Sequence, residues 1–221
     1  MNHTEPETPW TRYLRLMEER PEAFAADPAL PIVTDPREVE RFTARTGRTI
    51  GVVYESPYRL LVVDLVRGPE GSFAYERLLP AADGPAVVAV PVWEGKFVLL
   101  RQFRHALRGV QTAFPRGFGE NGLSAEENVR KEVWEELRAQ VLEQRTLGKI
   151  VADSGLTGGE AHAIFCRITR PEPPLQYEEI QGMVCLDREE LEREIAHGQI
   201  TDGFTLSAYA LYQAAEGDAG F

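Results

Sequence analysis

The sequence contains few of the residues on which several common catalytic chemistries depend. It has only two cysteines and four histidines in 221 residues. Cys166 and Cys185 lie in apolar, strand-like runs without the clustered spacing of a zinc site, so we expect two buried thiols rather than a disulfide. His105 has no evident base or nucleophile beside it, and no Ser/His/Asp or Cys/His arrangement can be identified.

Long apolar runs and basic residues are also scarce. The longest apolar stretches, LLVVDLV and PAVVAVPVW, are far shorter than the roughly 20 residues that a membrane-spanning helix requires. The beginning of the chain, MNHTEPETPWTRY, lacks the apolar core of a signal peptide. We therefore predict a cytoplasmic protein that does not contact membranes. The formal net charge of -11 argues against nucleic acid or an anionic membrane as the main partner, since both attract basic surfaces.

The order of strand and helix patterns predicts an α/β or α+β fold. Residues 1–47 are expected to form an N-terminal extension, in which Pro21 and the PALP stretch separate two short helices. Residues 48–221 are expected to form one domain. It starts with four strand-rich runs, and Gly95 between the last two predicts a hairpin turn. A helix at about 125–143 follows, then three strands and two helices, REELEREIAHG and TLSAYALYQAAEG.

The most informative stretch is 117–138, GFGENGLSAEENVRKEVWEELR. Its helix places Glu132, Glu135 and Glu136 within about one turn, where like charges repel by a few tenths of a kcal/mol per pair. A divalent cation would turn this repulsion into a binding site. The alternative is an ordinary solvated helix face, but three glycines in six residues favour a ligand, because they permit positive φ angles and close approach. Together with nearby arginines, such a metal would make the local charge positive enough for an anionic substrate to bind.

The start of this helix can be predicted closely. Ser124 is a good N-cap, and Glu127 three residues later completes a capping box, which places the first helical residue at Ala125. The apolar residues recur with helical spacing on a neighbouring arc, which predicts a helix that packs against a sheet. These residues are Val129, Val133, Leu137 and Val141.

The stretch resembles the Nudix box, G-x5-E-x7-R-E-U-x-E-E-x-G-U, where U is a bulky apolar residue. Gly117 takes the first position, Glu132 the central one, and Glu135 and Glu136 the terminal pair. Flanking segments KFVLLRQFRHA and FPRGFGE are similar to the ADP-ribose pyrophosphatase-like branch of that family. So is a G-x-I-x-D-x-x-T-L pattern formed by Gly198, Ile200, Asp202, Thr205 and Leu206. The resemblance covers about residues 48–215.

This resemblance implies an α/β/α sandwich with a mixed sheet and a metal-dependent hydrolase. It implies that Glu132, Glu135 and Glu136 bind Mg²⁺ or Mn²⁺ together with the backbone carbonyl of Arg116, whose side chain also offers a cation to the substrate. It further implies a homodimer, in which strands in residues 48–80 pack across the two subunits.

The resemblance also suggests residues outside the box. Glu178 or Glu179 would supply the catalytic base, beside the metal-bound Glu135 and Glu136, although ordinary solvated loop acids remain an equal alternative. Arg101 and Arg104 would grip phosphate oxygens, or serve only as surface charges. Glu160 follows a second glycine-rich loop, SGLTGG, and resembles a position near the site.

Three box positions depart from the family pattern. Leu123 stands where the first Glu is expected, Lys131 replaces the Arg, and Arg138 replaces the Gly. Leucine cannot pair with lysine, so we expect the ion pair that braces loop and helix to be missing. Arg138 removes a residue that stops helices, so we expect the helix to continue through Ala139–Glu143.

The predicted function is the metal-dependent hydrolysis of a nucleoside diphosphate linked to another moiety, with ADP-ribose or a nucleotide sugar first. Two alternatives stay open. One is a Nudix-fold nucleotide-binding module with weak or no hydrolysis, which the changes at Leu123 and Lys131 suggest. The other is a hydrolase for a biosynthetic nucleotide intermediate.

Overall fold

The protein is described by a computed structural model that covers residues 7–172 and 180–217. The chain divides into two compact units. The first contains the residues up to Ala81 together with Asp153–Gly159, and the second contains Ala82–Ala152 and the residues from Glu160 onward. The first unit therefore includes the expected extension up to residue 47 and also the strands that follow it.

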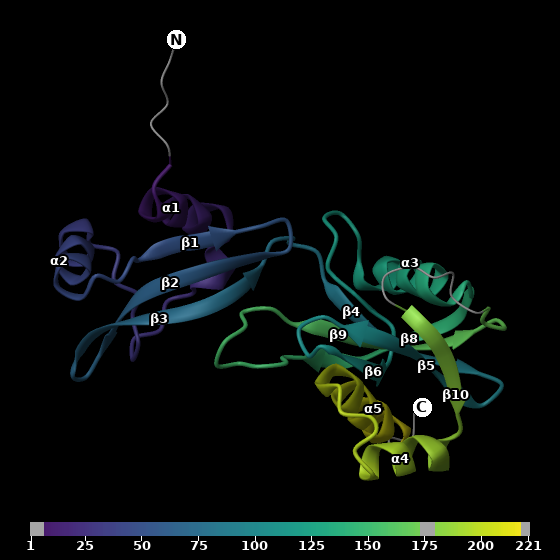
Figure 1. The fold of residues 1–221 in the computed structure, drawn as a ribbon. Coiled ribbons are helices and arrows are strands. Elements are labelled where there is room, and N and C mark those ends of the chain that lie inside the picture. Colours follow the sequence, from purple (N-terminus) through teal and green to yellow (C-terminus); the bar gives the residue numbers. More distant parts are fainter. Residues whose placement is uncertain (1–6, 173–179, 218–221) are drawn as a thin grey trace. The chain divides into compact units, whose positions relative to one another are not determined.

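The first unit combines short helices with a three-stranded antiparallel sheet in the order β1-β2-β3 (Figure 1). Its elements are α1 (Pro9–Glu19), η1 (Pro21–Phe24), α2 (Pro36–Thr46), β1 (Gly51–Glu55), β2 (Arg59–Gly68) and β3 (Gly71–Pro80). Both α-helices start with proline after a capping residue, Thr8 and Asp35 respectively, as the geometry of a first helical turn favours. The predicted pair of short helices separated by an extended crossing is confirmed.

Strand β2 forms the centre of the first unit, because it is buried on both faces. Leu60 and Val62 belong to an apolar cluster with residues of α1 and η1, whereas Val63 and Leu65 belong to a second cluster with residues of α2. Burial on both faces explains why LLVVDLV is an almost continuous apolar run instead of an alternating one.

The one acidic residue in that run, Asp64, is part of a buried polar network. Asp64 is 2% exposed. It accepts a hydrogen bond of 2.5 Å from the Tyr13 hydroxyl and one of 2.5 Å from Nε of Arg77. Arg77 also donates to the carbonyl oxygen of Ala23, at 2.6 Å. Burial, together with the Asp64 charge, raises the pKa of Tyr13, so its hydroxyl stays a donor at all ordinary pH values.

Segment Asp153–Gly159 belongs to the first unit because it pairs with β3. The Leu78 N–H donates to the Leu156 carbonyl at 2.8 Å, and the Gly158 N–H donates to the Leu78 carbonyl at 2.9 Å. A methyl group at Gly158 would lie 2.5 Å from Cδ2 of Leu79, so a larger residue would force the buried Leu79 side chain to shift. The second glycine-rich stretch, SGLTGG, is thus a structural contact of β3.

The second unit is built on a seven-stranded mixed sheet in the order β10-β5-β4-β9-β8, with β6 paired to β5 and β7 paired to β4 (Figure 1). Only β4 and β9 run parallel, and the other pairs are antiparallel. The strands are β4 (Ala86–Trp93), β5 (Lys96–Arg104), β6 (Gly109–Ala113), β7 (Arg116–Gly117), β8 (Val141–Ile150), β9 (Ala161–Ile168) and β10 (Ile180–Leu186). The strand patterns predicted all of these except the short β6 and β7 and the first half of β8, where Val141–Glu143 were expected to be helical.

The hairpin between β4 and β5 forms as predicted. Trp93 pairs with Lys96 across a two-residue turn. Glu94 has a φ of 47° and Gly95 a φ of 77°, which are the two positive values of the turn type that best matches strand twist.

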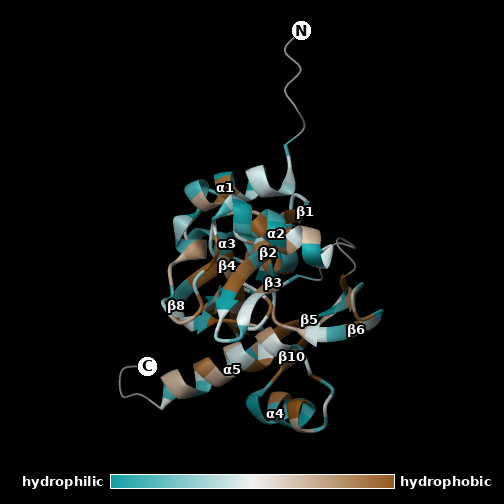
Figure 2. Cartoon of the chain, turned by 90° about the vertical axis from the view of Figure 1, so that its left-hand side faces the viewer, coloured by the Kyte–Doolittle hydropathy of each residue, from teal (hydrophilic) through white to brown (hydrophobic). Residues whose placement is uncertain are grey.

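Helices cover both faces of this sheet and complete an α/β/α sandwich (Figure 1). Helix α3 (Ala125–Leu137) packs Val129, Val133 and Leu137 on one face. Helices α4 (Arg188–Ala196) and α5 (Gly203–Glu216) pack on the other. Figure 2 shows α4 mainly in the hydrophilic colour, interrupted by apolar residues, as expected for a helix at the surface. Among the residues that the structure describes, no helix is long and apolar enough to cross a membrane.

The expected continuation of α3 through Ala139–Glu143 is wrong. The helix ends at Leu137, and Val141 already starts β8. Arg138 stops the helix itself, because it adopts the left-handed conformation with a φ of 53° while its N–H donates to the Trp134 carbonyl. Its guanidinium carbon lies 6.0 Å from the centre of the Trp134 ring. The chain has to turn at this point because Ala139 enters the core and Val141 pairs with Ile168.

Replacing Arg138 by glycine is expected to raise the free energy of unfolding by up to about 1 kcal/mol. Glycine adopts the left-handed conformation without the steric cost of a Cβ atom, and this gain outweighs the weak contact with Trp134. Urea denaturation of Arg138→Gly and Arg138→Ala measures the effect. Alanine keeps the strain and loses the contact, so Arg138→Ala should not be more stable than the wild type. A glycine variant that is less stable than the wild type would contradict this explanation of the helix end.

Both cysteines are free thiols in the structure, but only Cys166 is buried as expected, whereas Cys185 is partly exposed. Burial raises the pKa of Cys166 to about 12. In the unfolded chain a thiol has a pKa of about 8.5. Above that pH the unfolded state has lost the proton and the folded state has kept it, so stability falls as pH rises.

We expect Cys166 to lower the free energy of unfolding by about 1.4 kcal/mol per pH unit between about pH 9 and pH 10. The check is a series of urea melts at pH 7 to 10 for the wild type and Cys166→Ala. The pH slope of the alanine variant should be smaller by this amount. Equal slopes would show that the thiol ionises in the folded protein.

Candidate active site

The glycine-rich loop is joined to α3 by the predicted capping box. The Ser124 hydroxyl oxygen accepts a hydrogen bond from the Glu127 N–H at 3.2 Å. The Glu127 carboxylate accepts one from the Ser124 N–H at 2.9 Å. The helix therefore starts at Ala125, as predicted. The hydrogen bonds from Ser124 also lower the pKa of Glu127, so this acid is charged at the positive end of the helix.

Two glycines of the loop lie where a Cβ atom would meet a neighbouring group, and a third has a positive φ. A methyl group at Gly117 would lie 2.1 Å from Oε1 of Glu132. A methyl group at Gly119 would lie 1.7 Å from the carbonyl oxygen of Gly84. Gly122 has a φ of 86°. The prediction that these glycines provide positive φ and close approach is confirmed, and the closest approach at Gly117 is made by one of the three glutamates.

Asn128 fastens this loop to the helix, and sequence reasoning did not single it out. The residue is completely buried. Its amide nitrogen donates to the carbonyl oxygens of Phe118 and Pro85, each at 2.9 Å. These two bonds connect the glycine loop, the start of β4 and α3 one turn before Glu132. The sequence feature that could have identified Asn128 is its position next to Val129, which puts a polar residue on the side of the helix that packs on the sheet.

The three glutamates differ in their surroundings. Glu136 is 8% exposed, Glu132 packs over Gly117, and Glu135 lies 3.5 Å from the Lys131 ammonium. In the described part of the chain, no three His, Cys, Asp or Glu side chains converge closely enough to hold a metal ion. The ligand type nevertheless fits Mg²⁺, since carboxylate oxygens three and four residues apart share one helix face. A metal would have to draw Glu135 away from Lys131.

The brace between loop and helix exists, although Leu123 cannot provide it. The Lys131 ammonium pairs with the Glu120 carboxylate, three residues before the expected position. This hydrogen bond raises the pKa of Lys131. Leu123 is half-buried. The expectation of a missing ion pair is therefore wrong, because the folded loop brings a different acid to the lysine.

Glu120→Gln is expected to lower turnover about tenfold, because the loop that carries Gly117 loses its charged contact with α3, while stability changes by less than about 1 kcal/mol.

By contrast, the double change Leu123→Glu with Lys131→Arg should alter turnover less than about threefold, because the basic residue already has a partner. Steady-state rates and thermal melts measure both. Glu143→Gln, which removes an ion pair with Arg167 on neighbouring strands, is the control. A strong gain in the double variant would show that Glu120 is an inadequate brace.

Arg116 lies at the entry of the loop, but its side chain is directed to the other face of the sheet. It pairs with Val88, which belongs to the cluster under α5. Its Nη1 is 3.5 Å from Oδ1 of Asp202, and its guanidinium carbon is 4.9 Å from the centre of the Phe204 ring. The side chain therefore does not join the glutamates of α3, and only its backbone remains a candidate for the metal.

The G-x-I-x-D-x-x-T-L pattern has a structural role at the same place. Asp202 caps α5 by accepting a hydrogen bond from the Thr205 N–H at 3.0 Å. The buried hydroxyl of Thr205 accepts one from the Phe114 N–H at 3.0 Å. Since Phe114 lies just before the glycine loop, this pattern holds the start of the loop in position.

The two arginines of β5 do not lie on one face. Val98 and Leu100 belong to the cluster under α3, and Leu99 belongs to the cluster under α5. Because side chains alternate along a strand, Arg104 lies on the α3 face and Arg101 on the α5 face. Arg104 is half-buried and Arg101 is exposed. Only Arg104 shares a face with the glutamates.

In the part of the chain that the structure describes, no contact brings the remaining predicted residues to the loop. Glu160 is exposed and pairs with Lys149 across the neighbouring strands β8 and β9. Glu178 and Glu179 lie outside the described residues.

The comparisons with known proteins agree with this architecture. The model of the NUDIX domain matches residues 83–204. A search of curated proteins gave no match. Among solved structures, the crystal structure of an ADP compounds hydrolase is similar, with a TM-score of 0.66 and 17% sequence identity. The match covers 76% of this chain and 92% of that chain, which shows that the two share a fold.

The matched region includes the glycine loop, α3 and the Asp202 cap, and it comprises more than half of the chain. The seven-stranded sheet, α4, the box helix with its three glutamates and the glycine-dependent loop packing all lie within it. The chain therefore belongs to the Nudix family of pyrophosphohydrolases.

Proposed function

We propose that this protein hydrolyses the pyrophosphate linkage of a nucleoside diphosphate joined to another moiety, with ADP-ribose or a nucleotide sugar as the first candidates. The observation that carries the proposal is the position of Glu132, Glu135 and Glu136 on a helix held against a glycine loop. The similar solved structure is an ADP compounds hydrolase, which supports a substrate of this class. The products would be a nucleotide and a phosphorylated partner.

The proposed cofactor is Mg²⁺ or Mn²⁺, held by the three glutamates and the carbonyl of Arg116. Bound there, the ion would neutralise phosphate charge and lower the pKa of a water molecule. Asn128 and the Glu120–Lys131 pair hold the loop against the helix, so that the carboxylates keep their register with Gly117. Because Glu136 is buried, its charge acts in a medium of low dielectric constant, where it attracts a cation more strongly than in water.

The proposed site has further residues outside α3 and the glycine loop. We assign the contact with the diphosphate to Arg104, because it shares the α3 face of the sheet. Arg101 stays a candidate for the outer part of the substrate, although strand alternation places it on the opposite face of the sheet. Glu178 or Glu179 is the proposed base, and Glu160 would approach the substrate only after leaving Lys149.

The test is to add Mg²⁺ and ADP-ribose to the purified protein and to follow AMP release by chromatography. A panel of nucleotide sugars and biosynthetic nucleotide conjugates identifies the substrate class. Turnover that requires the metal and is abolished by chelation is the expected result. Absence of turnover on the whole panel would refute the enzymatic function.

A second candidate function is a nucleotide-binding module without efficient hydrolysis. The contact of Glu135 with Lys131, at 3.5 Å, favours it, because a lysine already neutralises part of the proposed metal site. Calorimetry with ADP-ribose in the presence of Mg²⁺ separates the two functions. Binding without AMP release supports the module, and binding with release supports the enzyme.

We also propose that the protein forms a homodimer through the strands of residues 48–80. Large apolar side chains on these strands and their connections are exposed, among them Tyr54 at 61%, Tyr58 at 65% and Phe73 at 42%. Exposed aromatic residues are enriched at protein interfaces. Sedimentation equilibrium should give the mass of two chains, and the mass of one chain would contradict the proposal.

A further inference from the structure

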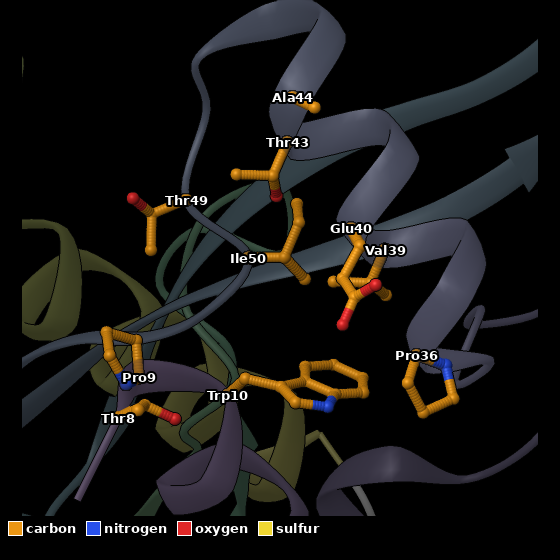
Figure 3. A pocket seen from close by; sticks show the side chains of 10 residues that line it. All are labelled: Thr8, Pro9, Trp10, Pro36, Val39, Glu40, Thr43, Ala44, Thr49 and Ile50. Atoms are coloured by element: carbon orange, nitrogen blue, oxygen red, sulfur yellow. The ribbon is translucent and has the colours of Figure 1, made fainter.

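The first unit contains a cavity of about 450 Å³ between α1, α2 and the start of β1 (Figure 3). This volume lies within the range of sites that bind small molecules. Trp10 enters from α1, Glu40 comes from α2, and the buried side chains of Val39 and Ile50 form its apolar wall. None of these residues belongs to the candidate active site, so the cavity calls for a separate explanation.

The walls of the cavity are fixed by local interactions of their own. Helix α1 starts with a capping box between Thr8 and Thr11. Its first residue lies so close to β1 that a methyl group at Gly51 would be 2.3 Å from the Pro9 carbonyl oxygen. Helix α2 is capped by Asp35 and ends at Gly47 in the left-handed conformation. A ligand would therefore enter a preformed site without having to order it.

The polar and aromatic groups of the cavity favour a cation. The Trp10 ring stacks on Tyr13, with ring centres 5.4 Å apart and an interplanar angle of 18°, and the same side chain lines the cavity. Within the described part of the chain, the Glu40 carboxylate has no hydrogen bond or ion pair. Figure 3 shows Glu40 and Trp10 reaching into the same space from two different helices. Among the described residues, those that line the cavity include no Lys, Arg or His.

We propose that this cavity binds a small organic cation, with its ammonium group between the Trp10 ring and the Glu40 carboxylate and its alkyl part against Val39 and Ile50. An aromatic face attracts a cation through its quadrupole, and the carboxylate adds a full opposite charge. A neutral apolar ligand would desolvate Glu40 without compensation. An anion would be repelled, and a bare metal ion would find only one carboxylate.

The test compares choline with 3,3-dimethylbutan-1-ol, a neutral molecule of nearly the same shape, on the full-length protein. The indole N–H signal of Trp10 in ¹H–¹⁵N spectra reports binding, and Trp10→Phe identifies that signal. Choline should shift the signal in a saturable way. The neutral alcohol should bind at least about tenfold more weakly, since it lacks the attraction to the ring and to the carboxylate.

Glu40→Gln keeps the size of the side chain and removes its charge, and the residue is exposed, so folding should be unaffected. This variant should bind choline about tenfold more weakly. Glu70→Gln is the matched control, because it removes the same charge from the exposed turn between β2 and β3, and it should bind choline normally. Equal affinities for choline and the alcohol, an unchanged affinity in Glu40→Gln, or no shift of the Trp10 signal would each overturn the proposal. None of these outcomes depends on hydrolysis.

Discussion

Glu136→Gln is expected to lower the turnover of ADP-ribose by at least about 100-fold. Glutamine has the shape of glutamate but no charge, so one of the three proposed carboxylate ligands loses its attraction for the cation. Glu136 is the most buried of the three, at 8% exposure, and water cannot easily replace a missing charge at such a place. Rates of AMP release over a range of Mg²⁺ concentrations measure the effect.

The control for this experiment is Glu126→Gln, which removes a charge from the exposed first turn of the same helix and should keep the rate within about twofold of the wild type. Calorimetric titration with Mg²⁺ gives a second readout, in which Glu136→Gln should bind the ion more weakly. Thermal melts of both variants exclude a folding defect. Full activity in a folded Glu136→Gln protein would place the catalytic metal elsewhere.

Asp64→Ala is expected to lower the free energy of unfolding of the first unit by about 3–5 kcal/mol. The Asp64 carboxylate accepts hydrogen bonds from Tyr13 and Arg77 in the core of this unit. Without it, the Arg77 guanidinium, whose side chain is 17% exposed, stays largely buried without its counter-charge. The Tyr13 hydroxyl also loses its acceptor, and such a group costs free energy when it is left unsatisfied. Urea denaturation followed by Trp10 fluorescence measures this unit.

Glu76→Gln is the matched control for Asp64. Glu76 lies on β3 and pairs with Arg48 at 3.4 Å, with both side chains 55% exposed. Since exposed ion pairs contribute little, this variant should change stability by less than about 1 kcal/mol. A comparably small effect of Asp64→Ala would mean that the buried network is not needed for folding. Replacing Trp93 and Trp134 by phenylalanine in all variants restricts the fluorescence signal to Trp10.

Much of the candidate site could be predicted from the sequence, because its signals are local. The capping box at Ser124 lies within four residues, and the spacing of Glu132, Glu135 and Glu136 fixes their helix face without reference to the rest of the chain. The turn at Gly95 is likewise determined by two residues. These predictions are confirmed or remain proposals, and none of them required knowledge of a distant contact.

Other predictions failed where residues distant in the sequence decide the outcome. The partner of Lys131 is Glu120, because the folded loop brings that carboxylate to the ammonium. The end of α3 at Leu137 results from the burial of Ala139 and the pairing of Val141 in β8. These contacts outweigh the weak preference of arginine for continuing a helix.

The sequence by itself determined the family, the hairpin with its turn at Gly95, and the helix that carries the glutamates. It also explained why the loop before that helix contains glycines. Only the tertiary structure decided which side chains meet. It placed Arg101 and the Arg116 side chain on the face of the sheet away from α3, and it buried Asn128 and Asp64 in contacts with distant carbonyls and side chains. The physical reason is the sequence separation of the interacting residues. Capping and helix spacing involve residues within one turn, whereas burial and ion pairing depend on how the whole chain packs.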